Sequence, residues 1–248
     1  MERLSKSKIA RYATLKHRKG RKKEKLFIVQ GVKAVRDTLP HFDLEILMVR
    51  DELETPPGVN KGKIFLVSEL EMKKISTLND VPEIIAVFRI PQTHFDIKID
   101  EWNDFILVLD GVSDPGNFGT IIRTSHWFGI RKIFCSIECP DLYNPKVVQS
   151  SMGSIAQIEI IYCDLDNLFS ANPKVPVYGL LLDGEDIFRP RNLPPGFIVM
   201  GNEGHGISKD IIRHITTPLT IPPSQPDNHP DSLNVAVATA ITIAQLKQ

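Results

Sequence analysis

Six short, almost entirely apolar runs in residues 104–248 constrain the fold more than any other feature of this sequence. Strands that are apolar on both faces are typical of a parallel sheet with helices on both sides. We therefore predict an α/β domain over residues 104–248. The predicted strands are Phe105–Leu109, Lys132–Ile137, Ile155–Tyr162, Val177–Leu182, Phe197–Met200 and Leu219–Ile221. The predicted helices are Asn117–Phe128, Pro145–Met152, Asp210–Ile215 and Leu233–Leu246.

A smaller α/β pattern precedes this domain, in residues 26–91. Four apolar runs alternate with two helical patterns, and the spacing of Ser68 and Glu71 predicts a capping box at the start of the second helix. We predict a small α/β domain here, joined to the larger one by a linker over residues 92–103. The predicted strands are Leu26–Val29, Leu44–Val49, Ile64–Val67 and Ile84–Ile90, with helices at Gly31–Leu39 and Ser68–Leu78.

The net charge of the chain is zero, with 30 basic and 30 acidic residues, but the charge is unevenly distributed. Residues 1–25 hold eleven Lys or Arg and two Glu, a net charge of +9, so the remaining residues carry −9. We predict that residues 1–25 form a basic arm that binds a polyanion such as RNA. The alternative is a solvated terminus that only aids solubility. The overall composition is that of a globular protein and excludes a disordered, collagen-like or disulfide-scaffold chain.

The cysteines and the hydropathy bear on the cellular compartment. Cys135, Cys139 and Cys163 are odd in number and lack the spacing of metal ligands. We expect buried, reduced thiols, no metal site and a cytoplasmic protein. No apolar run approaches the roughly 20 residues of a membrane span, and the N-terminus lacks the apolar segment of a signal peptide, so we expect no membrane segment.

Three loops that follow predicted strands favour ligand binding. The first, residues 110–125, is rich in glycine, opens a predicted helix at Asn117 and leads to Arg123. The second, residues 200–208, presents Glu203 between glycines. Its G-x-x-G-x-G spacing is not the dinucleotide-binding fingerprint, which argues against a nicotinamide enzyme.

The third loop, residues 221–235, is rich in proline and precedes the last predicted helix. Ser232 or Asp231 is a plausible N-cap for that helix, and Ser232 with Asn234 could do no more than cap it. Because all three loops follow strands of one parallel sheet, we expect them to meet at its carboxyl edge, where α/β proteins bind ligands.

Together, the three loops resemble motifs 1, 2 and 3 of the SpoU (TrmH-type) RNA 2′-O-ribose methyltransferases in the SPOUT superfamily. The matching segments are Asp114-Pro-Gly-Asn-Phe-Gly-Thr-Ile-Ile-Arg-Thr, Gly201-Asn-Glu-Gly-His-Gly-Ile-Ser and Ser232-Leu-Asn-Val, in the expected order. Residues 26–89 resemble, less specifically, the substrate-binding domain that often precedes this domain, through Phe27-Ile-Val-Gln-Gly-Val-Lys. The Gly20-Arg-Lys-Lys-Glu run before it is also typical of such enzymes.

This resemblance implies a C-terminal parallel-sheet domain with a trefoil knot, an exception to the usual unknotted topology. It also implies a homodimer in which each active site is completed across the interface. S-adenosylmethionine would lie bent in the knot, in contact mainly with backbone. The implied cofactor-binding residues are Leu181, Leu182, Asp183, Gly184, Met200, Gly201, Asn202, Gly204, Gly206, Ile221, Pro222, Pro223 and Leu233.

The same resemblance implies roles for five catalytic residues. Arg123 is either the base or the anchor for the ribose 2′-hydroxyl or a phosphate, and both roles stay open because arginine ordinarily keeps its proton. Asn117 and Asn234 position the reacting groups, Glu203 orients Arg123 or the substrate, and Ser232 supports the site. The sulfonium carries its own activation, so no metal is required. The predicted RNA-binding residues are Arg18, Lys19, Arg21, Lys22, Lys23 and Arg123.

Ribosomal RNA is favoured over transfer RNA as the substrate, by analogy with proteins that carry such an N-terminal domain. Three residues depart from the family pattern by lacking positive charge or bulk, namely Gln149, Ala156 and Gln157, and the loop over residues 222–231 is longer than usual. These departures bear on the substrate and on the loop over the cofactor. The alternative function is a non-catalytic RNA-binding or ribosome-assembly protein with a vestigial knot.

Overall fold

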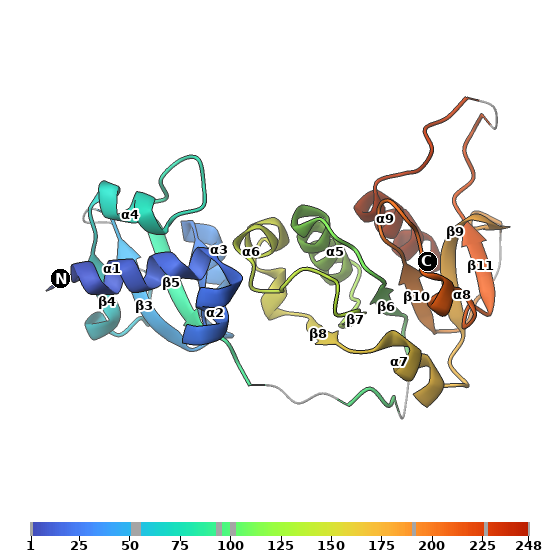
Figure 1. Cartoon of the computed structure of the whole chain (residues 1–248), viewed down its shortest axis with the longest axis horizontal. Helices are drawn as coiled ribbons and strands as arrows, with labels where there is room; N and C mark the ends of the chain where they lie inside the picture. The colour runs from blue at the N-terminus through green and yellow to red at the C-terminus, as the bar shows by residue number, and fades with distance from the viewer. Residues whose placement is uncertain are drawn as a thin grey trace. The chain divides into compact units, whose positions relative to one another are not determined.

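The computed structural model of the chain describes residues 2–50, 56–92, 96–99, 103–189, 192–225 and 228–247. Contacts within the chain divide it into two compact units, and most of their helices and strands are labelled in Figure 1. Unit 1 comprises Met1–Thr93 and Asp141–Ala156, and unit 2 comprises His94–Pro140 and Gln157–Gln248. A segment from the second half of the sequence therefore packs within the first unit. The predicted linker and the loop over residues 222–231 lie partly outside the described residues.

Unit 1 is built on a five-stranded mixed sheet in the order β1-β4-β3-β5-β2, in which β5 runs antiparallel to its neighbours β2 and β3. Its strands are β1 (Glu2–Arg3), β2 (Leu26–Gln30), β3 (Leu44–Val49), β4 (Ile64–Leu66) and β5 (Ile84–Arg89). Its helices are α1 (Lys6–Ala13), η1 (Thr14–Lys16), α2 (Arg18–Glu24), α3 (Val32–Thr38), η2 (Lys61–Lys63), α4 (Glu69–Ile75), α6 (Pro145–Ser151) and η3 (Ser154–Ala156).

The basic N-terminal segment belongs to the core of unit 1, which corrects the expectation of a separate arm. Its apolar side chains are buried in one cluster with residues of β2, β3, α4 and β5. The cations occupy the other faces of the helices, so a segment that looks like a charged tail is amphipathic. The buried residues of this segment are Leu4, Ile9, Tyr12 and Leu15.

Two local features of unit 1 bear on the sequence predictions. Ser68 and Glu71 form the predicted capping box of α4, in which the Ser68 backbone N–H donates to the Glu71 carboxylate at 3.0 Å. On the opposite face of the sheet from α1, Phe27 packs against Tyr143 with ring centroids 4.6 Å apart. Burial raises the pKa of the Tyr143 hydroxyl to about 12. An aromatic contact thus fixes the segment around α6 to β2.

Unit 2 contains the predicted parallel sheet. Its six strands run parallel in the order β11-β9-β10-β6-β7-β8. The strands are β6 (Ile106–Leu109), β7 (Lys132–Cys135), β8 (Glu159–Tyr162), β9 (Val177–Asp186), β10 (Phe197–Met200) and β11 (Thr217–Thr220). The helices are α5 (Pro115–Trp127), α7 (Leu165–Ala171), α8 (Lys209–Ile212) and α9 (Val235–Leu246).

Helices cover unit 2 in the way the apolar strands predicted. Buried side chains of β6, β10 and the neighbouring strands form one apolar cluster with α7 and α8. Helix α5 packs against α9. Some boundaries differ from prediction. The strand expected from Ile155 begins at Glu159, because residues 154–156 form a 3-10 turn, and α7 was not predicted. Residues 97 and 99 of the predicted linker pack on unit 2, where Ile99 N–H donates to the Asn172 side chain at 2.8 Å.

No helix among the described residues is long and apolar enough to cross a membrane. The three cysteines are free, as predicted. Cys135 and Cys139 are buried, whereas Cys163 is partly exposed.

Candidate active site

The first of the three loops starts where β6 ends. Asp114 is the N-cap of α5, and its carboxylate accepts a hydrogen bond from the Asn117 backbone N–H at 2.9 Å. Pro115 follows at the first helical position, where a missing N–H costs nothing. Because Asp114 caps the helix, the side-chain amide of Asn117 is available for other contacts.

Glu203 joins the second loop to the first. Its carboxylate accepts hydrogen bonds from Ser113 N and Ser113 Oγ, both at 2.9 Å, from Asp114 N at 3.2 Å and from Asn117 Nδ2 at 2.9 Å. Burial acts to raise the pKa of Glu203, but the hydrogen bonds from Asn117 and Ser113 outweigh it and lower the pKa to about 2. Glu203 is therefore a fixed carboxylate at neutral pH, not a proton acceptor.

Asn234 joins the third loop to the other two. Its Nδ2 donates to Asn117 Oδ1 at 3.0 Å, while its Oδ1 accepts from Ala236 N at 2.9 Å and so caps α9. Asn234 is the N-cap of this helix, which corrects the prediction of Ser232 or Asp231. A continuous set of hydrogen bonds thus runs from Glu203 through Asn117 to the start of α9.

The glycine-rich second loop is closed by its own backbone. Asn202 and Gly206 exchange two N–H to carbonyl hydrogen bonds at 2.9 Å, and Gly206 adopts φ +69°. A side chain at Gly201 would overlap the Gly206 backbone. Asn202 Nδ2 also donates to the Gly111 carbonyl at 2.6 Å, and this contact fixes the second loop to the first.

Two residues that the sequence reasoning did not single out support these loops. Asp110 is buried, and its Oδ2 accepts from the Ser208 N–H at 2.7 Å, across the two loops. Ser113 supplies two of the four hydrogen bonds to Glu203. Both lie in the first loop, residues 110–125, so the signal was an acid and a hydroxyl within four residues of the end of an apolar strand.

The structure does not bring every predicted catalytic residue into this set of hydrogen bonds. Arg123 is exposed on α5 and has no hydrogen-bond or ion-pair partner among the described residues. Glu203, which we expected to orient Arg123 or the substrate, instead holds Asn117 and the first loop. Ser232 is exposed, and within the described part of the chain it makes no hydrogen bond to the other four.

The predicted cofactor-binding residues of β9 lie in an irregular part of that strand. Strand β11 pairs with Gly179 at Pro218 and then with Glu185 at Leu219, so residues 180–184 form a bulge between two paired stretches. A bulge redirects side chains, and here Leu182 is 82% exposed. The Leu182 carbonyl accepts from Thr220 Oγ1 at 3.1 Å.

Residues of this region suit S-adenosylmethionine. Strands β11, β9 and β10 are neighbours and parallel. The second half of β9 (residues 181–184), the end of β10 with its loop (residues 200–206) and the residues after β11 (221–223) therefore lie at the same edge of the sheet. Leu182 and the half-exposed Leu233 offer apolar side chains, and the glycine-rich loop offers backbone N–H and carbonyl groups. A flat base that needs apolar contact and a few polar backbone contacts fits such a region.

Five of the six cations predicted to bind RNA lie in unit 1, where they fall into two sets. Arg18, Lys19, Lys22 and Lys23 are exposed on α2 and have no acidic partner among the residues that the structure describes. Arg21 is only 2% exposed and is bound to Asp141, with Nη2 to Oδ2 at 2.7 Å. The prediction that Arg21 contacts RNA therefore has to be corrected, because its guanidinium is buried and already paired.

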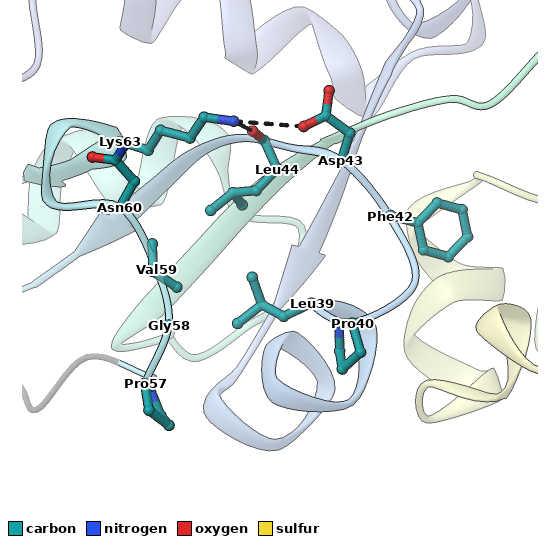
Figure 2. Close-up of a pocket in the computed structure, with 10 residues that line it drawn as sticks. All are labelled: Leu39, Pro40, Phe42, Asp43, Leu44, Pro57, Gly58, Val59, Asn60 and Lys63. Carbon is teal, nitrogen blue, oxygen red and sulfur yellow. Dashed lines mark hydrogen bonds and ion pairs between the residues drawn. The ribbon is translucent and has the colours of Figure 1, made fainter.

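A separate hollow of about 490 Å³ lies in unit 1 (Figure 2). Leu39, Leu44 and Val59 line it, and Lys63 reaches Asp43 at one end with 3.5 Å between Nζ and Oδ1. None of the described residues that line it is a predicted site residue.

Among the described residues, no group of three His, Cys, Asp or Glu side chains is placed to hold a metal ion.

Comparison with known proteins places this site in a family. The model of the SpoU rRNA Methylase family matches residues 104–244, more than half of the chain. The chain belongs to this family. The model of the MRM3-like substrate binding domain matches residues 6–86, which includes most of the basic N-terminal segment. The family match covers all three loops, and the second match agrees with the folding of α1 and α2 into unit 1.

Relatives resemble the chain over its whole length. The 23S rRNA (guanosine(2553)-2′-O)-methyltransferase RlmP of Bacillus subtilis is 28% identical, over 97% of this chain and 96% of its own length. A solved structure assigned to the TrmH family of RNA methyltransferases, from Porphyromonas gingivalis, is 35% identical, covers 98% of both chains and has a TM-score of 0.83. An AdoMet-bound rRNA methyltransferase from Sinorhizobium meliloti, 24% identical, shares the fold with a TM-score of 0.84, over 100% of this chain and 96% of its own.

Proposed function

We propose that this member of the SpoU family methylates a ribose 2′-hydroxyl in ribosomal RNA. The chain is an S-adenosylmethionine-dependent RNA 2′-O-ribose methyltransferase. The observation that carries the proposal is the continuous hydrogen bonding of Glu203, Asn117 and Asn234, because it assembles the three motif loops into one site. The Bacillus subtilis relative, which acts on 23S rRNA, supports ribosomal RNA over transfer RNA.

The chemistry divides between the cofactor and the protein. When bound, S-adenosylmethionine supplies a methyl group on a positively charged sulfur. The ribose oxygen would form the new bond to the methyl carbon as the carbon–sulfur bond breaks, which leaves a neutral thioether, and the hydroxyl proton would pass to water. A ribose hydroxyl is a weak nucleophile, so the protein contributes mainly by holding it in line, an effect worth about 7–11 kcal/mol in well-oriented systems.

We assign the positioning of the reacting groups to Asn117 and Asn234. Hydrogen bonds fix the orientation of both amides, with Asn117 Nδ2 on Glu203 and Asn117 Oδ1 on Asn234. Preorganised dipoles of this kind need no rearrangement during the reaction. Glu203 acts through Asn117, since its own oxygens are used by four donors.

We assign the anchoring of the RNA next to the reacting ribose to Arg123. The side chain is exposed on the helix that begins at the site, and it has no acidic partner among the described residues. An arginine keeps its proton in proteins and binds phosphate in a bidentate fashion. These properties favour an anchor over a base.

We also propose that the enzyme is a homodimer with a trefoil knot, as the family resemblance implies. Helix α9 has no charged residue within Val235–Leu246, yet Val237 is 48% exposed. Its neighbour α5 ends on Trp127, which is 82% exposed. Uncharged helix faces are usually covered, and a second copy of the chain would cover this one.

Free cysteines and a ribosomal substrate support a cytoplasmic location.

Mapping of 2′-O-methyl groups in cellular RNA with and without the gene tests the function. We expect one ribosomal RNA position to lose its methyl group, and to regain it with the wild-type gene. A lost position in transfer RNA would overturn the assignment of the substrate. An unchanged map, together with no S-adenosylmethionine binding by calorimetry, would support the non-catalytic alternative instead.

A further inference from the structure

The buried arginine of α2 is a starting point for an inference about how RNA binding reaches the active site. Arg21 Nε and Nη2 both donate to Asp141 Oδ2, at 2.9 and 2.7 Å. Its Nη1 donates to the carbonyls of Leu15 and Lys16, at 2.9 and 3.0 Å. The guanidinium is thus fully used inside unit 1, between the basic helix and the start of the segment Asp141–Ala156.

Asp141 and the residues after it are held to unit 1 at several points. Asp141 Oδ1 accepts from the Tyr143 N–H at 3.1 Å, and the Tyr143 ring packs on Phe27. At the far end of the segment, a side chain at Gly153 would crowd the Asp37 side chain. The segment therefore moves with the sheet and with α2, not as a free loop.

The residues immediately before Asp141 hold the first motif loop in unit 2. Ser136 Oγ accepts from the Gly111 N–H at 3.0 Å, and Cys139 Sγ donates to the Leu109 carbonyl at 3.4 Å. Gly111 begins the loop whose Ser113 and Asp114 bind Glu203. Only Pro140 separates Cys139 from Asp141, and its ring stiffens the chain between the two sets of contacts.

We propose that Arg21 and Asp141 are positioning residues, which transmit the placement of RNA on α2 to the first motif loop. This inference rests on the proposed function, because it takes the exposed cations of α2 as the RNA-binding surface. RNA bound to the exposed cations of α2 restrains this short helix, and Arg21 lies on the opposite, buried face of the same helix. The ion pair carries that constraint to Asp141, and the stiff Cys139–Asp141 stretch carries it to Gly111 and so to Asn117.

An ion pair is suited to this task because it is directional. Apolar contacts at this position could slide, whereas two donors on one carboxylate oxygen set the distance and angle of the segment relative to α2. Burial of such a pair costs free energy that apolar packing would not, and the role that we infer for it is to define the position of the segment.

The test uses the full-length protein and separates rate from affinity. Asp141→Asn removes the charge with little change of shape. Glu24→Gln is the matched control, because it breaks the Arg11–Glu24 pair, 2.6 Å long, on the same helix without touching the 141–156 segment. The measurements are single-turnover methyl transfer at saturating S-adenosylmethionine and ribosomal RNA from a strain lacking the gene, RNA affinity by filter binding, and cofactor affinity by calorimetry.

We expect Asp141→Asn to lower the rate at saturating RNA between about tenfold and a hundredfold, as small misplacements do, while both affinities stay within about twofold. Glu24→Gln should keep the wild-type rate. An unchanged rate in Asp141→Asn, an equal loss in Glu24→Gln, or a loss confined to RNA affinity would each overturn the inference.

A second measurement covers the case in which Asp141→Asn does not fold. Arg21→Lys keeps the charge but loses the bidentate contact, and hydrogen exchange of residues 110–117 should then quicken relative to wild type. Unchanged exchange there would overturn the inference. Failure of the proposed function appears differently, as wild-type protein that does not methylate ribosomal RNA or binds it independently of the α2 cations.

Discussion

Helices α2 and α5 each carry an arginine that we predicted to contact RNA, and the two arginines have opposite environments. Arg21 of α2 is buried and paired with Asp141, whereas Arg123 of α5 is exposed without an acidic partner among the described residues. The residue type is the same, but the helix face differs. The comparison shows that a basic run in a sequence indicates a charged helix. Only the fold shows which of the cations in that run can contact a ligand.

The different environments of the two arginines follow from how each helix packs. On α2, Gly20 lies against the Thr14 backbone, where a side chain would overlap it, so this side of the helix faces inward and takes Arg21 with it. On α5, the solvent-facing stripe runs through Thr120, Arg123 and Trp127, at the three- and four-residue spacing of one helix face. Each prediction below tests one side of this contrast.

Replacement of Arg21 should have the largest effect on stability. Arg21→Met leaves the mostly buried Asp141 without its partner, which typically costs about 3–5 kcal/mol, so unit 1 should unfold at a clearly lower denaturant concentration. Lys22→Met, one residue further along the same helix, is the control and should change stability by less than about 0.5 kcal/mol. Chemical denaturation measures both, and equal effects would remove the distinction between the two faces.

Replacement of Arg123 should affect the reaction instead of the fold. We expect Arg123→Ala to lower methyl transfer by about 10²-fold, because RNA without this anchor would no longer hold its ribose in line, with melting temperature and S-adenosylmethionine affinity unchanged. Arg131→Ala, at another exposed arginine of unit 2, should retain activity. Methyl transfer near the wild-type rate in Arg123→Ala would refute the assigned role.

Neutralisation of the outer face of α2 should act on RNA affinity. If Lys22 and Lys23 each contact a phosphate, the double change to Gln should reduce the salt slope of binding by roughly 1.4, given about 0.7 per contact with single-stranded RNA. Deletion of residues 1–25 is not a suitable test, because it also removes buried core residues. An unchanged slope would exclude Lys22 and Lys23 as phosphate contacts.

The smallest effect concerns Glu203 and is a change in how the stability of the protein depends on pH. Its pKa is lowered to about 2, so its contribution to stability is present above the ordinary pKa of about 4.5 and is lost as the pH falls from there towards 2. Glu203→Gln should therefore show a shallower loss of stability over this range than wild type. Thermal unfolding at pH 2–5 measures the difference, and parallel curves would contradict the assignment.

The sequence predicted the larger sheet well because its strands are buried on both faces, which leaves short and continuous apolar runs. The prediction was wrong for the N-terminal segment, where many charged residues mask a few buried apolar ones. Residues 2–25 look like an arm since cations outnumber apolar residues, yet four buried side chains suffice to bring the segment into the core. Strand β9 was predicted to end at Leu182, where the apolar run ends, but the strand continues through the polar residues up to Asp186.

For the site, the sequence identified the loops but not their bonding. Neighbouring strand ends predicted that Asn117, Glu203 and Asn234 would meet, and they do. That Glu203 binds Asn117 and not Arg123 could not be read from spacing, because it depends on the Ser113 and Asp114 N–H groups that turn towards it. The roles of these residues in catalysis, the knot and the dimer stay predictions.

The grouping of Asp141–Ala156 with unit 1 has a consequence for protein engineering. Residues 104–248, if produced alone, would leave Val147, Val148 and the Tyr143 ring without their neighbours in unit 1, so this piece should be poorly soluble. A chimera that borrows the substrate-binding domain of a relative must also borrow the matching 141–156 segment. The unit of exchange between such enzymes is then two separate stretches of sequence, not one.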